Sequence, residues 1–77
     1  MTNVTSRNPE IAPLAFEVLG SEKWGYYVKM WDAGVPEGDY LELCRQDRFC
    51  DWPSKQEAAT KAAAVLRELA DLLEASV

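Results

Sequence analysis

Residues 54–75 have the sequence SKQEAATKAAAVLRELADLLEA, and they say more about the fold than any other part of the chain. No glycine or proline interrupts them, and most are strong helix formers. Ser54 and Glu57 have the spacing of a capping box, in which the serine hydroxyl accepts a hydrogen bond from the glutamate amide. Apolar residues recur at spacings of three and four, which predicts one long amphipathic C-terminal helix. This apolar stripe consists of Ala58, Ala62, Val65, Leu66, Leu69, Leu72 and Leu73.

Three segments upstream of this helix have the two-residue period of β-strands. Residues 14–20 alternate apolar with smaller or charged side chains, and residues 24–31 are aromatic and β-branched. Residues 40–45 alternate again after a loop that contains two glycines and a proline, and residues 49–52 are expected to form a short fourth strand or an extended lead-in. The pattern predicts an α+β fold, with an antiparallel three- to four-stranded β-meander packed on one long C-terminal helix.

Residues 9–19 have a second interpretation, as a short helix with Ile11, Leu14 and Val18 on one face. The chain would then have the helix, three-strand, helix order of a double-stranded RNA-binding domain. We favour the strand, because residues 20–23 then supply a hairpin turn into the next strand. The acidic balance also argues against RNA binding, because the last helix begins with only Lys55 and Lys61 as basic residues.

The 77 residues are enough for one domain. Residues 1–13 are rich in Thr, Asn, Ser and Pro and are expected to be a flexible tail, with residues 14–77 as the single domain. No apolar run approaches the ~20 residues that span a bilayer, and residues 1–9 have no signal-peptide character, so we expect a cytoplasmic protein. Reduced thiols are then expected at Cys44 and Cys50, although a bridge across the intervening turn stays open.

The composition argues against catalysis. The chain has no histidine, which is the commonest general base and the commonest metal ligand. Two cysteines alone do not make a zinc site, and no glycine-rich run precedes a helix to hold phosphate. We therefore predict no enzyme activity, no catalytic residue, no metal and no cofactor. The net charge of −5 further argues against direct binding to nucleic acid.

One helix covers only one face of a sheet, so the other face is predicted to be open. The face opposite the helix is predicted to carry Tyr27, Lys29, Trp31, Tyr40, Glu42 and Cys44. The helix-side face is predicted to carry Phe16, Val18, Trp24, Tyr26, Val28, Met30, Leu41 and Leu43. Aromatic residues are enriched at interface hot spots, so we predict a binding surface on the open face. Alternatively, the N-terminal segment or the long loop covers it.

The net charge is concentrated in one segment. Residues 32–51 carry six acids and two bases, a net charge of −4. This segment predicts an acidic surface that meets a basic partner, the alternative being a solvated loop. The predicted partner-binding residues are Tyr27, Trp31, Asp32, Glu37, Asp39, Tyr40, Glu42 and Asp47.

In length and acidity the chain resembles the small single-domain inhibitors that phages and mobile elements encode, the anti-CRISPR proteins among them. The resemblance is one of size and composition and carries no motif. It implies a non-enzymatic inhibitor or adaptor that binds a larger basic protein or ribonucleoprotein in a host cytoplasm. Such a protein is expected to bind neither nucleic acid directly nor a membrane.

The alternative function is a homodimeric structural or accessory domain. The order of strands followed by a helix, closing on residues 49–58, is similar to that of short uncharacterised bacterial domains. A helix of about 22 residues is ~33 Å long, longer than an eight-residue strand at ~26 Å. Its end, around Leu69, Leu72, Leu73 and Val77, is therefore expected to extend past the sheet, where it could pair with a second copy.

Overall fold

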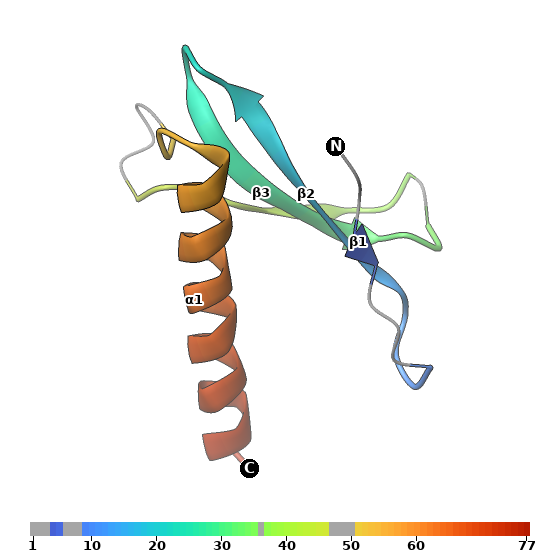
Figure 1. The fold of residues 1–77 in the computed structure, drawn as a ribbon. Coiled ribbons are helices and arrows are strands. Elements are labelled where there is room, and N and C mark those ends of the chain that lie inside the picture. Colours follow the sequence, from blue (N-terminus) through green and yellow to red (C-terminus); the bar gives the residue numbers. More distant parts are fainter. Residues whose placement is uncertain (1–3, 6–8, 36, 47–50) are drawn as a thin grey trace.

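The computed structural model describes residues 4–5, 9–35, 37–46 and 51–77. Three main antiparallel strands form a meander, and a two-residue strand pairs at its outer edge. The strands are β1 (Val4–Thr5), β2 (Leu14–Ser21), β3 (Gly25–Asp32) and β4 (Tyr40–Leu43), in the order β1-β2-β3-β4. One helix, α1 (Lys55–Ala75), packs on one face of this sheet (Figure 1). The predicted α+β meander with one C-terminal helix is confirmed.

The β2–β3 hairpin closes later than predicted. Strand β2 continues to Ser21, which pairs with Gly25, so the turn is formed by residues 22–24 instead of 20–23. Trp24 consequently lies in the turn and is 62% exposed, and the prediction that it faces the helix is wrong. The helical alternative for residues 9–19 is also wrong, because β2 pairs with β3 along its whole length.

Residues 51 and 52 run beside the start of β3. The Trp52 amide donates to the Tyr26 carbonyl (3.1 Å), and the Tyr26 amide donates to the Trp52 carbonyl (2.8 Å). Residues 49–52 were predicted to form a short fourth strand or an extended lead-in, and residues 51 and 52 form an isolated bridge and no strand. Residues 49 and 50 lie outside the described residues. The bridge brings the chain back to the sheet directly before α1 begins.

The first half of α1 packs against the sheet. Ser54 caps the helix, because its side-chain oxygen accepts a hydrogen bond from the Glu57 amide (3.0 Å) as predicted. Ala58 and Ala62 are buried against Val28 on β3, since their small side chains let the helix backbone come close to the strands. The partly buried residues packed against this cluster are Val18, Tyr26, Met30, Leu43 and Trp52. The predicted helix-side face is therefore confirmed at Val18, Tyr26, Val28, Met30 and Leu43.

Part of the segment expected to be a flexible tail takes part in the sheet. Val4 pairs with Phe16 and Thr5 pairs with Ala15, which places β1 at the outer edge of β2. Nearer the domain, the Pro13 carbonyl accepts a hydrogen bond from the Ala33 amide (2.8 Å). These contacts link the N-terminal segment to the edge of the sheet and to the loop after β3.

The second half of α1 runs on past the strands, as Figure 1 shows. Its apolar side chains are exposed there, among them Leu69, Leu72 and Leu73, as expected for a helix that is longer than the sheet. In the part of the chain that the structure describes, no helix has the combined length and apolarity needed to cross a membrane.

Candidate protein-interaction site

The sheet face opposite α1 brings aromatic and charged side chains together. The strand register places Trp31 of β3 directly opposite Tyr40 of β4, and Lys29 opposite Glu42. On the other side of β3, Lys29 is opposite Glu17 of β2. Side chains at paired positions lie on the same face, so these residues form one surface. We call this surface the open-face patch, and it consists of Glu17, Tyr27, Lys29, Trp31, Tyr40 and Glu42.

Lys29 lies at the centre of the open-face patch. Its Nζ is 4.5 Å from the centroid of the Tyr40 ring and 5.5 Å from that of the Trp31 ring. The negative faces of both rings attract the ammonium group. Glu17 and Glu42 occupy the paired positions on either side of it. Two rings therefore hold the ammonium group of the protein's own lysine, and the strand register places an acidic residue on each side of it.

Nearby carboxylates act on Tyr27 of the open-face patch. Burial raises the pKa of Tyr27, and the negative charges of Glu42 and Asp51 raise it further. The charges of Glu42 and Asp51, which disfavour the tyrosinate anion, would attract an approaching cation, whereas burial disfavours a charge of either sign. The open-face patch is thus suited to basic side chains.

The loop between β3 and β4 adds a rim to the patch. A hollow of roughly 230 Å³ is lined by Lys29, Trp31, Glu37, Gly38 and Tyr40. Glu37 thereby brings another carboxylate beside the two rings. Tyr40 is 58% exposed, so the described part of this loop leaves its ring accessible. Strand β1, from the N-terminal segment, lies at the edge of β2.

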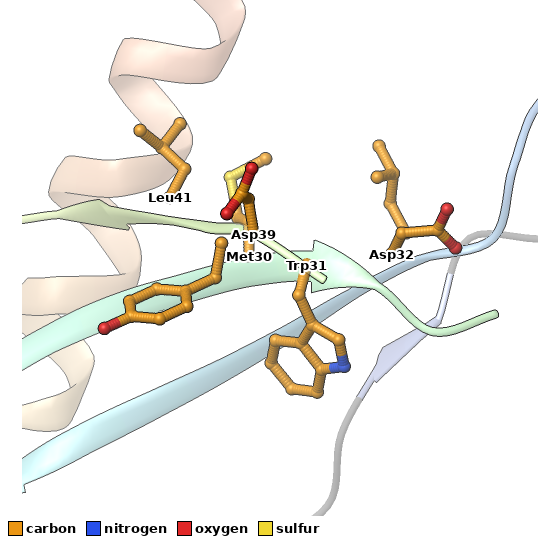
Figure 2. A pocket seen from close by; sticks show the side chains of 7 residues that line it. Met30, Trp31, Asp32, Asp39 and Leu41 are labelled. Atoms are coloured by element: carbon orange, nitrogen blue, oxygen red, sulfur yellow. The ribbon is translucent and has the colours of Figure 1, made fainter. Parts of the chain in front are cut away.

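The predicted partner-binding residues fall into two groups. Tyr27, Trp31, Tyr40 and Glu42 belong to the open-face patch, and Glu37 lies at its rim. Asp32 and Asp39 line a second hollow, of roughly 340 Å³, to which Trp31 and Tyr40 also contribute. Figure 2 shows Met30, Asp39 and Leu41 on one side of the sheet and Trp31 on the other. Asp47 lies outside the described residues.

Asp32 also has a local structural role. Its Oδ1 accepts a hydrogen bond from the Gly34 amide (2.8 Å), a contact typical of an aspartate that begins a turn. This contact engages one of its carboxylate oxygens within the loop after β3. Its part in partner binding stays a prediction.

The sequence analysis placed Lys29 on the face opposite the helix and did not single out Glu17. The position of Lys29 between two aromatic neighbours follows from alternation along β3 combined with the pairing of Trp31 and Tyr40. Glu17 joins the patch only through the register of β2 against β3. That register depends on where the hairpin turns, which the sequence placed two residues too early.

Among the described residues, no group of three or more acidic, cysteine or histidine side chains lies close enough to hold a metal ion. Comparison with known protein families, with characterised proteins and with solved structures finds no match to this chain. The candidate site therefore rests on the geometry and charge of its own residues.

Proposed function

We propose that this protein is a non-enzymatic interaction domain that binds a larger basic protein through the open-face patch. The observation that carries the proposal is the position of Lys29, held over Tyr40 and Trp31 with a carboxylate opposite on each neighbouring strand. A lysine or arginine of a partner would find the same two rings and the same carboxylates if Lys29 moved aside. Binding of a basic side chain is therefore an exchange of one cation for another.

The charge of the patch favours a protein over a nucleic acid as the partner. Glu17, Glu42 and Glu37 surround the rings, and their carboxylates repel phosphate groups. Proteins that bind nucleic acids present basic surfaces, and an acidic, aromatic surface is complementary to them. By covering such a surface the domain would act as an inhibitor or adaptor. This is the mode of action implied by its resemblance in size and charge to anti-CRISPR proteins.

The exchange predicts that Lys29→Gln strengthens binding of an arginine-rich peptide. The variant leaves the rings and carboxylates vacant, and a cation–π contact at an exposed site is worth about 0.5–1 kcal/mol, or about two- to fivefold in Kd. Isothermal titration calorimetry at low ionic strength measures this change. Lys23→Gln is the matched control, because Lys23 lies 5.0 Å from the ring of Trp24 outside the patch and its loss changes the net charge equally.

Two tryptophan variants provide a second test with a matched control. Trp31→Ala is expected to weaken peptide binding, whereas Trp24→Ala, at the exposed hairpin turn, is expected to leave it nearly unchanged. Circular dichroism shows whether each variant keeps its fold. The proposal would be contradicted if both tryptophan variants lost affinity equally, or if Lys29→Gln and Lys23→Gln had the same effect. Either result would indicate attraction by net charge alone.

A further inference from the structure

The outer edge of β4 is open in the part of the chain that the structure describes. The strand order is β1-β2-β3-β4, so β4 is the last strand on its side, whereas β1 covers the edge of β2 on the other side. No backbone group of the described residues pairs with this edge from outside. Tyr40, Leu41 and Glu42 are all exposed, and β4 contains neither lysine nor proline, which often protect edge strands. An edge of this kind can accept a further strand.

Hydrogen bonds at the two ends of β3 show which of its residues point toward β4. Tyr26 exchanges two backbone hydrogen bonds with Trp52, on the side of β3 away from β2. Beyond the other end of β3, the Ala33 amide donates to the Pro13 carbonyl, in line with β2. These backbone groups alternate in direction along a strand. Even-numbered residues of β3 therefore point toward β4, and odd-numbered residues point toward β2.

The backbone groups of Tyr40 and Glu42 consequently face outward. Met30 is even-numbered and pairs with Leu41, so the N–H and C=O groups of Leu41 point toward β3. Tyr40 and Glu42 flank Leu41, and their N–H and C=O groups point the other way, at the open edge. Both residues also have their side chains in the open-face patch. A strand that pairs at this edge would extend the patch by one more row of side chains.

The charges beside this edge favour a basic strand. Glu42 lies on β4, and Glu37 and Asp39 precede it in the chain. A second copy of the protein would bring another segment with a net charge of −4 over residues 32–51 to the same edge, and the like charges disfavour that pairing. A basic side chain opposite Glu42 or Tyr40 gains an ion pair or a cation–π contact instead.

The helix side of the same edge favours an apolar side chain. Leu41 is 54% exposed on that side and lines the second hollow together with Met30 (Figure 2). A residue of an added strand that pairs with Leu41 lies on this side of the sheet. An apolar side chain there would cover the exposed part of Leu41. The complementary strand therefore alternates basic and apolar residues.

We infer that the basic partner binds as an additional antiparallel strand along β4, through an extended segment in which basic and apolar residues alternate. Its basic residues pair with Tyr40 and Glu42, and the apolar residue between them pairs with Leu41. The added strand continues the sheet, in which every strand pair is antiparallel. This inference rests on the proposed function and adds the backbone conformation in which the partner reaches the open-face patch.

Backbone N-methylation of a peptide ligand tests the inference on the full chain. The probe is a peptide of alternating arginine and valine in two forms with equal numbers of methyl groups, one N-methylated at arginines and the other at valines. In the antiparallel arrangement the arginine amides point at β4 and the valine amides point away. We expect methylated arginines to raise Kd about tenfold or more, and methylated valines to change it less than about twofold, by isothermal titration calorimetry. Equal Kd values, or a larger loss from methylated valines, would overturn the inference.

Hydrogen exchange of the protein's own amides separates the failure of this inference from that of the proposed function. By NMR, we expect the Tyr40 and Glu42 amides to exchange faster than the Leu41 amide in the free protein and to become protected when the unmethylated peptide binds. A bound peptide that moves the Lys29 side-chain resonances and leaves these two amides unprotected would overturn strand addition alone. Absence of binding by every form of the peptide would contradict both.

Discussion

Replacing Gly25 with alanine is expected to lower the free energy of unfolding by about 2–4 kcal/mol. Gly25 has a φ of 87°, which side-chain-bearing residues rarely adopt. A Cβ at this position would also lie 2.6 Å from the backbone of Asp51, far inside van der Waals contact. Either the hairpin must distort or residues 51–52 must move away, and the second change would break the bridge that leads into α1.

Gly34→Ala is the matched control for this effect. Gly34 lies outside the positive-φ region, and a Cβ added there would have a side-chain oxygen of Asp32, which can shift, as its nearest neighbour at 3.2 Å. We expect its free energy of unfolding to change by no more than ~0.5 kcal/mol. Denaturant unfolding of both variants measures the difference. Equal losses in the two variants would show that Gly25 is not specially constrained.

Ala58→Leu is expected to destabilise the protein by about 1–3 kcal/mol through overpacking. Ala58 has an exposed fraction of 0% and packs on Val28, with Trp52 against the same cluster. Three extra carbon atoms there must push the helix away from the sheet or force side chains off their rotamers. Thermal and denaturant unfolding of the variant, with circular dichroism as the readout, measures the loss.

Ala59→Leu makes the same chemical change one residue along the helix, where the side chain is exposed. It is expected to leave the free energy of unfolding within ~0.5 kcal/mol of wild type, because both residues are strong helix formers. If Ala58→Leu were as stable as Ala59→Leu, the close approach of α1 to β3 would be refuted.

The helix and the sheet faces were predictable because their signals are local. Ser54 and Glu57 mark the helix start through a contact between near neighbours, and the stripe in residues 54–75 gives its buried face. Alternation likewise placed Val28 and Met30 toward the helix. Local capping and side-chain periodicity were enough to predict these elements from the sequence.

The position of the hairpin turn was not predictable in the same way. Gly20 and Gly25 both have positive φ, and either one could have marked the turn. The contact that distinguishes Gly25 is its close approach to Asp51, a residue far away in sequence. For this reason Trp24 was predicted to lie in the strand, whereas it lies in the turn.

The candidate site was predictable only in part, for a different reason. Alternation already separates Asp32 from Trp31 and Asp39 from Tyr40, so these acids belong on the opposite side from the rings (Figure 2). Counting charge along residues 32–51 joined them into one predicted surface. The central place of Lys29, in contrast, needed the pairing of three strands. The register between strands cannot be read directly from the sequence.

The displacement of Lys29 by a basic ligand is the most direct test of the proposed binding mode. NMR of the Lys29 side chain reports it, because stacking near the Tyr40 and Trp31 rings shifts its methylene protons upfield. On addition of an arginine-rich peptide, we expect these resonances to move toward their unstacked positions while those of Lys23, beside Trp24, stay in place. Peptide binding that leaves the Lys29 resonances unchanged, or shifts Lys23 and Lys29 alike, would contradict the proposal.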